Sequence, residues 1–379
     1  MSAPIHLSQE EAFARIRLLR SPNIGPISYF QLLRRFATAS AAIEALPDLA
    51  RRGGRPYSAA PVERIEREIL AARAAGARYL FHDSPHYPEL LGQLESAPPV
   101  LTFRGDLALA SRPCVALVGA RNASAVAVKL AREFAAALAE QGFVVVSGLA
   151  RGIDGAVHQG ALSAGKGGGG GGTIGVIASG IEIAYPPQHA GLQERIASEA
   201  LLLAEQPPGT EPRASHFPSR NRIIAGLSLG TLVIEAAPRS GSLITARLAG
   251  EAGREVMAIP GSPLEPRSHG CNQLIRDGAV LVQSPAEVVE LLEGFTGHPR
   301  STVSEAHPHV LPLGDGPTEN EWPADPADIA ALLTTAPIGV DELIRQTGQP
   351  AGAVQTALLE LEIAGLLVRH AGGRVSLAG

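Results

Sequence analysis

The sequence is poor in aromatic residues and in excess charge, and both shortages narrow what the protein can be. Phe, Trp and Tyr make up 4% of the 379 residues, so a surface built from many stacked rings is not expected. Lys and Arg number 32 against 37 Asp and Glu, which gives a formal net charge of -5. A chain with this balance carries no global nucleic-acid footprint. Any anion site must therefore be a local concentration of positive charge.

Cysteine and long apolar runs are also scarce. Cys114 and Cys271 are the only cysteines, so a disulfide framework or a zinc site has almost no support. Cys114 lies in an apolar strand-like run and is expected to be a buried free thiol. The first residues, MSAPIHLSQEEAF, lack the apolar core of a signal peptide, and no apolar run is long enough to span a bilayer. We expect a cytoplasmic protein without a membrane partner.

The length predicts more than one domain, and the first is expected over residues 1–76. An Ile24-Gly25-Pro26 turn precedes an amphipathic segment, as in the SAM-like and helix-hairpin-helix modules that sometimes grip a nucleic-acid backbone. A plain helical packing module is at least an equal alternative, because one such turn is a weak signal. The helices are predicted at Gln9–Leu19, Ile27–Phe36, Ala39–Leu46 and Pro61–Ala74.

The second region, residues 77–295, alternates between two hydrophobic periods. Short β-rich runs are separated by helix-period segments such as Val126–Gln141 and Ser242–Ala252. Continuous apolar strands divided by helices are typical of a mostly parallel sheet that is covered on both faces. The pattern predicts an α/β fold, one extended Rossmann-like domain with seven strands, at CVALVGA, FVVVSG, TIGVIASG, LLLAEQ, TLVIEAA, EVMAIPG and AVLVQS.

The remaining residues divide into a linker and a small domain. Residues 296–323 are rich in Pro and Gly and lack periodicity, which is typical of a linker. Residues 324–379 show a helix-turn-helix spacing followed by a hairpin, which predicts a winged helix. Its second helix, Ala351–Ala364, contains Glu360 and Glu362 but no Lys or Arg. Because DNA readers carry a basic second helix, we expect partner docking here rather than major-groove reading.

Signatures of cofactors, metals and nucleophilic catalysis are missing. The glycine run 167–172 follows Lys166 and precedes a predicted strand, so it is expected to be a surface loop rather than a P-loop. The sequence has no dinucleotide fingerprint, no nucleophile elbow and no metal-ligand spacing. Ser147, Asp154 and His158 resemble a triad, but His158 falls one turn after Asp154 on the same predicted helix. We therefore predict no catalytic residue, no cofactor and no metal.

Four of the predicted strands end in glycine-rich or small-residue turns that lead into the next segment. The carboxyl ends of parallel strands share one edge of the sheet, where ligands bind. Helix N-termini there offer free N–H groups and a favourable dipole to anions, and Asp154 is expected to cap one of these helices. The stretch FPSRNRIIAGLS adds cations to the same region. The sequence thus predicts a phosphate-binding edge that carries Arg121, Arg151, Arg220 and Arg222.

These segments together resemble the DNA-processing protein A family, also called DprA or Smf. The resemblance is carried, in order, by VALVGARNAS, VVSGLARGIDGAVHQGAL, IASGIEIAYPP, EQPPGTEP, FPSRNRIIAGLS, VIEAAPRSGSLITARLAGEAGREVMAIPG and GCNQLIRDGAVLV. It covers about residues 87–292, and the helical and winged-helix regions agree with the layout of some family members. The polyglycine run departs from the family's shorter loop, which places any contact of that loop in doubt.

The resemblance implies a function that composition alone does not show. Family members bind single-stranded DNA, load the RecA recombinase onto it, and protect incoming DNA in natural transformation. They act as homodimers through the Rossmann-like domain, and no enzymatic activity is implied. Carried over by motif, the DNA-binding residues are Gly119, Arg121, Ser147, Gly148, Arg151, Arg220, Asn221 and Arg222, with Ser240 and Gly241 as weaker candidates.

Two other functions stay open at this level. Related Rossmann-like domains hydrolyse nucleotides with glycine-rich turns and a glutamate, and GTLVIEAAPRSGS with Glu235 loosely matches such a site. Glu235 would then be a base or ribose ligand, whereas in a purely structural role it would pair with Arg222 or cap a helix. The third interpretation is a structural adaptor that works chiefly through the winged helix.

Overall fold

The computed structural model describes residues 7–53, 56–164, 170–294, 325–370 and 372–378. The described chain forms two compact units, one over residues 67–294 and one that combines residues 7–66 with residues 325–378. The predicted linker and the first three residues of the predicted polyglycine loop lie outside the described residues. None of the described helices is long and apolar enough to cross a membrane.

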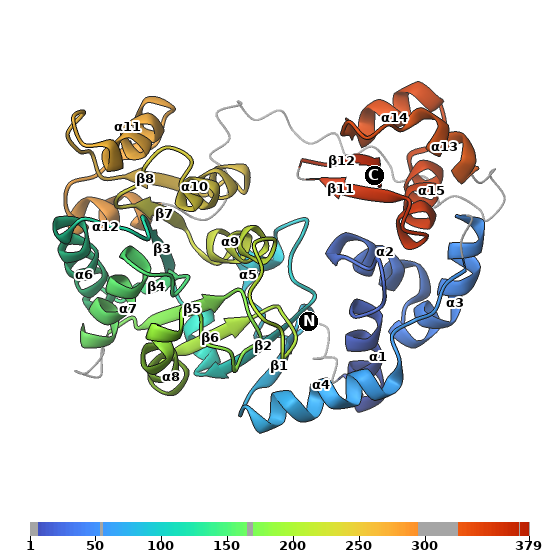
Figure 1. The fold of residues 1–379 in the computed structure, drawn as a ribbon, viewed down its shortest axis with the longest axis horizontal. Helices are drawn as coiled ribbons and strands as arrows, with labels where there is room; N and C mark the ends of the chain where they lie inside the picture. Colours follow the sequence, from blue (N-terminus) through green and yellow to red (C-terminus); the bar gives the residue numbers. More distant parts are fainter. Residues whose placement is uncertain (1–6, 54–55, 165–169, 295–324, 371, 379) are drawn as a thin grey trace. The chain divides into compact units, whose positions relative to one another are not determined.

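The first unit is built on one mixed sheet in which most neighbours run parallel (Figure 1). Its order is β1-β2-β6-β5-β4-β3-β7-β8-β9, and only β1 and β2 join it in antiparallel fashion. The α/β prediction is confirmed, but β1 (Arg78–Phe81) and β2 (Val100–Gly105) were not among the seven predicted strands. Their sequences, RYLF and VLTFRG, mix polar with apolar residues, because antiparallel strands need no continuous apolar run. The other strands are β3 (Cys114–Val118), β4 (Val144–Ser147), β5 (Thr173–Ile177), β6 (Leu201–Ala204), β7 (Gly230–Val233), β8 (Glu255–Ala258) and β9 (Val280–Leu281).

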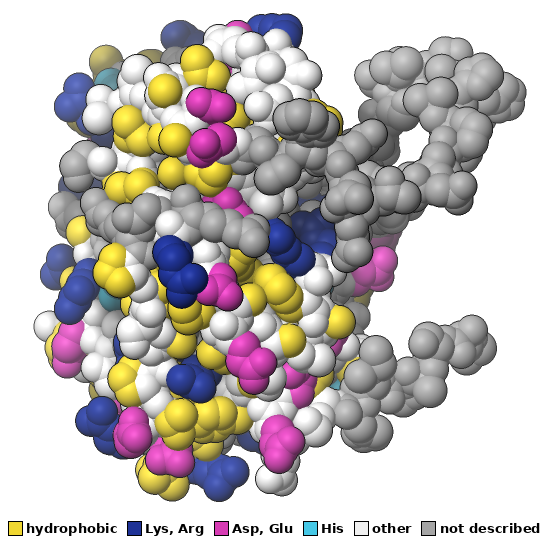
Figure 2. All heavy atoms as spheres, turned by 90° about the vertical axis from the view of Figure 1, so that its right-hand side faces the viewer, with side chains coloured by type: hydrophobic (Ala, Val, Ile, Leu, Met, Phe, Trp, Pro, Cys, Tyr) yellow, Lys and Arg dark blue, Asp and Glu magenta, His cyan; other side chains and the backbone are white. Residues whose placement is uncertain are grey.

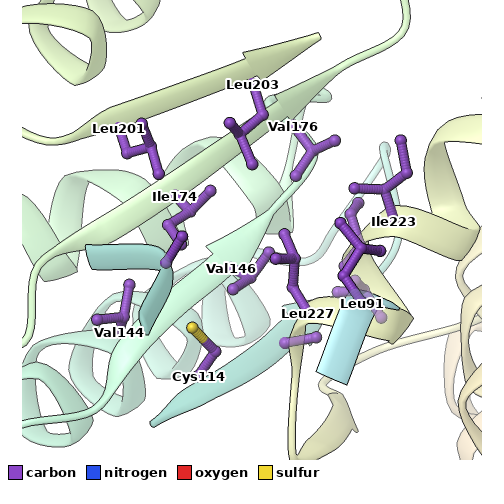
Figure 3. Close-up of a cluster of buried hydrophobic side chains, with 14 of the residues drawn as sticks. Leu91, Cys114, Val144, Val146, Ile174, Val176, Leu201, Leu203, Ile223 and Leu227 are labelled. Atoms are coloured by element: carbon purple, nitrogen blue, oxygen red, sulfur yellow. The ribbon is translucent and has the colours of Figure 1, made fainter. Parts of the chain in front are cut away.

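Helices cover both faces of this sheet because successive strand residues point to opposite sides. On one face, Val146, Ile174 and Val176 belong to the same core as Ile223 and Leu227 of α9 (Figure 3). That face is covered by α5 (Glu89–Gly92), α9 (His216–Leu227), α10 (Gly241–Glu251) and α11 (His269–Arg276). The opposite face is covered by α6 (Ala125–Glu140), α7 (Ile153–Ala164), α8 (Ala190–Glu199) and α12 (Pro285–Glu293).

The strand order contains a switch point between β3 and β7. From β3 the chain builds outward through β4, β5 and β6, and it then returns to place β7, β8 and β9 on the other side of β3. The loops that leave β3 and β7 consequently run to opposite faces of the sheet. In open α/β sheets, a crevice at the carboxyl ends of two such strands is where ligands bind.

The second unit combines the N-terminal helices with a winged helix. Ser8 and Thr38 begin helices by accepting backbone N–H groups of Glu11 and Ala41, and Gly348 ends another in a left-handed conformation. The third helix extends past the predicted end at Leu46. The helices are α1 (Gln9–Leu19), α2 (Pro26–Phe36), α3 (Ala39–Arg52), α13 (Pro326–Leu332), α14 (Val340–Thr347) and α15 (Ala351–Ile363). The strands are β10 (Ile338–Gly339), β11 (Leu367–His370) and β12 (Arg374–Leu377), and α4 (Val62–Ala74) leads toward β1.

Candidate functional site

Two neighbouring pockets open at the carboxyl edge of the sheet. The Tyr185 pocket has a volume of about 240 Å³, and its wall includes Gly148, Arg151, Tyr185 and Gln188. The switch-point pocket has a volume of about 670 Å³ and extends between the loops that follow β3 and β7; its lining includes Gly119, Asn122, Asp154, Asn221, Ser240, Gly241 and Arg267. The two pockets share Arg121, Ala150, Phe217 and Arg220, so they form one continuous site.

Arg220 is the fixed cation between the two pockets. It lies on α9 with only 6% of its surface exposed, and its Nη1 donates to the carbonyl of Val176 at 3.2 Å. Burial lowers its pKa, and the nearby Asp154 carboxylate opposes this shift. Its Nε has no hydrogen-bond partner within the described residues. Gly148 makes this position available, because a Cβ there would overlap the Arg220 guanidinium.

Asp154 is the carboxylate that partly offsets the charges of Arg220 and Arg121, and it is not the helix cap that the sequence predicts. The helix α7 begins at Ile153, so Asp154 lies inside its first turn and the capping prediction is wrong. Its Oδ2 instead accepts the backbone N–H of Ala150 at 3.3 Å. Burial raises the pKa of Asp154, while Arg220 and Arg121 lower it. Because it is the single carboxylate that lines either pocket among the described residues, the site stays positively charged in an acidic protein.

Aromatic rings form part of the Tyr185 pocket, which the sequence analysis missed. The Phe217 ring contacts both Arg121, whose Cζ is 4.8 Å from the ring centroid, and Tyr185, whose ring centroid is 5.8 Å away. Tyr185 is 44% exposed. The low aromatic content is an average over the chain and does not describe this edge. The available signal was position, since Phe217 opens the FPSRNR stretch and Tyr185 follows a predicted strand end.

The switch-point pocket is shaped by the start of α10. Ser240 caps this helix by accepting the Ser242 N–H at 3.4 Å, and Asn221 Nδ2 donates to the Gly241 carbonyl at 3.3 Å. Asn221 thus ties α9 to α10 beside the opening. Arg239 and Arg267 also line this pocket, and the sequence analysis named neither. Cations from three different loops therefore meet at one edge, which no local motif displays.

Two of the predicted site residues lie outside both pockets. Ser147 is fully buried, and its hydroxyl donates to the Leu117 carbonyl at 2.7 Å. Arg222 forms an ion pair with Glu205, with both side chains largely buried. The structure therefore gives Ser147 and Arg222 packing contacts in place of access to a ligand. For Arg222 the reason is helical geometry, because Arg220 and Arg222 are two residues apart on α9 and face different directions.

Glu235 and His158 also have structural partners. Glu235 accepts the Ser124 N–H at 2.8 Å and the Ser124 hydroxyl at 2.7 Å. Of its two structural alternatives, the pairing with Arg222 is therefore wrong, and Glu235 instead supports the start of α6 through the Ser124 cap. His158 Nδ1 contacts the Thr173 hydroxyl at 2.8 Å, and that hydroxyl donates to the Val145 carbonyl. His158 Nδ1 is therefore the donor. Burial lowers the pKa of His158 to about 3, so it is neutral.

The doubly covered sheet and the arginine-lined crevice at its carboxyl edge define a Rossmann-like protein, and such crevices are where this fold class takes its ligands. Three family models match the chain: "DprA-like N-terminal HHH domain" over residues 9–71, "DNA recombination-mediator protein A" over residues 78–293 and "DprA winged helix domain" over residues 315–373. The chain belongs to the DNA-processing protein A family, as the sequence resemblance indicated.

Individual relatives agree with this assignment. The chain is 37% identical to Protein Smf of Escherichia coli over 84% of this chain and 82% of that protein. It is 46% identical to the DNA processing protein DprA of Streptococcus pneumoniae over 55% of this chain and 71% of that protein. The crystal structure of DprA from Streptococcus pneumoniae aligns with a TM-score of 0.62 at 35% identity, covering 77% of this chain and 99% of that one. A Helicobacter pylori DprA structure, described by its single-stranded DNA binding mode, aligns with a TM-score of 0.51 at 28% identity, covering 58% and 97%.

Proposed function

We propose that the two pockets form a groove that binds single-stranded DNA without reading its sequence. The observation that carries this proposal is the continuity of the pockets through Arg121 and Arg220, with aromatic rings in one pocket and a helix start in the other. Arginines and backbone amides suit phosphates, and an exposed ring suits an unpaired base. The Helicobacter pylori relative, described as binding single-stranded DNA, supports the same chemistry.

The groove suits an unpaired strand better than a duplex. Tyr185 is partly exposed and forms one wall of a pocket of about 240 Å³, a setting in which a splayed base can stack. Bases in a duplex are already stacked and paired, so they do not enter such a pocket without being unpaired. The remaining contacts are to phosphates, which carry no base identity.

From its family membership, we further propose that the bound strand is passed to the RecA recombinase. The protein would load RecA onto incoming DNA, protect that DNA in natural transformation, and act as a homodimer through the Rossmann-like unit. The test of loading is whether the protein shortens the lag before RecA filaments form on a single strand. Sedimentation of the free protein measures its oligomeric state.

We propose binding without catalysis, and the hydrolase alternative finds no support at the site. Glu235 is 6% exposed, does not line either pocket, and has both oxygens engaged by Ser124. Ser147, the nucleophile of the triad considered above, is buried and donates to a backbone carbonyl. If a mononucleotide displaces an oligonucleotide at equal concentration, this part of the proposal is wrong.

The deciding experiment compares the affinity for a fluorescent oligo-dT strand with that for a duplex of equal length. We expect at least about tenfold tighter binding of the single strand. Tyr185→Ala should weaken it by about 5- to 150-fold, because base stacking contributes about 1–3 kcal/mol per base. Arg247→Ala is the matched control: Arg247 is on α10, is exposed and pairs with Glu251 outside both pockets. Equal affinity for the two DNAs, or an unaffected Tyr185 variant, would contradict the groove.

A further inference from the structure

The second helix of the winged helix, α15, has two apolar faces instead of one. Val354, Leu358 and Leu361 pack into the core of the winged helix itself. Leu359 and Ile363, one helical turn apart, belong to a different core, which they share with the N-terminal helices. The members of that core from α2 and α3 include Tyr29, Leu32, Leu46, Leu49 and Ala50. The N-terminal module therefore completes its core with side chains from the other end of the chain.

Polar contacts also join the N-terminal helices to the winged helix, along the contact surface that we call the seam. Asn23 has a left-handed backbone (φ 61°), and its Nδ2 donates to the Ile363 carbonyl at 3.1 Å. Gln31 Nε2 donates to Gln355 Oε1 at 3.2 Å, and Gln31 Oε1 accepts from Arg369 Nη2 at 3.4 Å. Donors and acceptors are thus matched across the seam, as in a specific interface.

Two glycines leave space for close contacts: Gly53 for the backbone of α15, and Gly365 for the side chain of Asn23. A Cβ on Gly53, at the end of α3, would lie 2.7 Å from the Ala364 Cβ and would also overlap the Glu360 carbonyl. A Cβ on Gly365 would lie 2.8 Å from Asn23 Nδ2. These contacts leave no room for a larger residue. Figure 1 draws α15, in red, beside the blue helices α2 and α3.

The elements through which such modules bind nucleic acid elsewhere are the second helix of the winged helix, which lies in this seam, and the Ile24-Gly25-Pro26 turn, which lies next to it in the chain. In a DNA-reading winged helix the second helix enters the major groove, whereas here α15 is covered by the N-terminal helices. In the hairpin turn, the Gly25 N–H donates to the Ser28 hydroxyl at 2.9 Å, and Asn23 points at α15. On the face that Figure 2 presents, Lys and Arg side chains alternate with Asp and Glu, without a continuous basic field among the described residues.

We propose that the N-terminal helical module is the intramolecular partner of α15. The two modules form a clamp, in which helices of the same chain cover and hold the second helix of the winged helix. While the two are docked, neither a DNA groove nor a second protein reaches α15. The proposal does not depend on the single-stranded DNA groove, because it concerns the other compact unit. It replaces the expected external docking partner with a segment of the same chain.

Hydrogen–deuterium exchange of the full-length protein tests the proposal. Gly53→Leu should separate the two modules, because its side chain meets the Glu360 backbone. We expect amide exchange to rise at least about tenfold both in α3 and in residues 359–365. Gly352→Leu is the matched control, since Gly352 lies on α15, the helix that Gly53 approaches, with nothing within 4 Å of its Cβ position. It should leave both segments unchanged.

A milder variant keeps the test decisive if Gly53→Leu disrupts α3 itself. Asn23→Asp places a carboxylate opposite the Ile363 carbonyl and should raise exchange in residues 359–365 about threefold. If exchange in residues 359–365 stays at the wild-type rate in both variants, the clamp does not exist. Protection of α15 on addition of a single-stranded or duplex oligonucleotide to the wild-type protein would also overturn it, since DNA would then reach the helix.

Discussion

Each of the two compact units contains motifs that are typical of nucleic-acid binding. Only the unit with the large sheet leaves the groups of these motifs open to a ligand. At the carboxyl edge of the sheet, Arg121 and Arg151 are exposed and Arg220 faces two pockets. In the other unit, the hairpin turn at Gly25 and the second helix of the winged helix are engaged by the chain itself. A binding motif therefore indicates function only where the protein itself does not engage the groups that would contact the ligand.

The same contrast exists on a small scale within α9. Arg220 and Arg222 are two residues apart, yet one faces the pockets and the other pairs with Glu205. Charge density in the sequence counts both equally. The structure separates a cation that is available to a ligand from a cation that is neutralised internally.

The largest expected effect is the loss of stability on removing Arg222, the arginine that is paired inside the protein. Arg222→Ala should lower the free energy of unfolding by about 3 kcal/mol, because Glu205 would stay largely buried without its partner. It should leave the salt dependence of DNA binding unchanged. Arg121→Ala should do the reverse, with little loss of stability and a salt slope that is smaller by up to about 0.7. Thermal melts and binding at several salt concentrations measure both quantities; a common response of the two variants would erase the distinction.

Gly148→Ala tests whether the open edge depends on the space left for Arg220. The added methyl group overlaps the guanidinium, so Arg220 must move or the loop must shift. We expect a loss of about 1–3 kcal/mol in stability, as for other overpacked sites, together with weaker binding of single strands. Gly191→Ala on α8 is the control, because nothing lies within 4 Å of its Cβ position. Wild-type affinity in Gly148→Ala would show that Arg220 does not contact the ligand.

The pH dependence of stability should report the burial of His158, which lies beneath the carboxyl edge of the sheet. Its pKa is about 3 in the folded protein and near 6.5 in the unfolded chain, so the unfolded state binds the proton first as the pH falls. The contribution of neutral His158 to the free energy of unfolding is fully present above pH 6.5 and is lost on acidification toward pH 3. From pH 6.5 to pH 5 this amounts to about 1.5 kcal/mol. Denaturant unfolding of His158→Gln should lack this component, and an equal pH slope in the two proteins would contradict it.

The smallest expected effect is that of removing the winged helix on DNA affinity. The chain cut after Gly294 keeps every residue that lines the two pockets, so its affinity for a single strand should stay within about twofold of the full-length value. Exchange in α3 should rise at the same time, because Leu359 and Ile363 leave its core. If binding disappears while the remaining protein stays folded, the DNA site is not at the sheet edge.

Much of the fold follows from local patterns in the sequence. The apolar runs at residues 114–118 and 144–147 are strands because they are short, continuous and rich in Val, and helix-period segments follow them. Turn residues at the strand ends then predict a binding edge. The antiparallel strands β1 and β2 were not predicted, since neither shows a long apolar run or strict alternation.

The α/β architecture, the edge at which polar loops gather and the acidic character of α15 all follow from local sequence patterns. Which of the candidate residues can reach a ligand depends on how the chain packs. Arg220 faces the pockets because Gly148 leaves space for it, whereas Arg222 is paired with Glu205 from another loop. Hydrophobic periodicity can be seen in residues that are close in the sequence. Whether a side chain is paired inside the protein depends on residues that come close to it only in the folded structure.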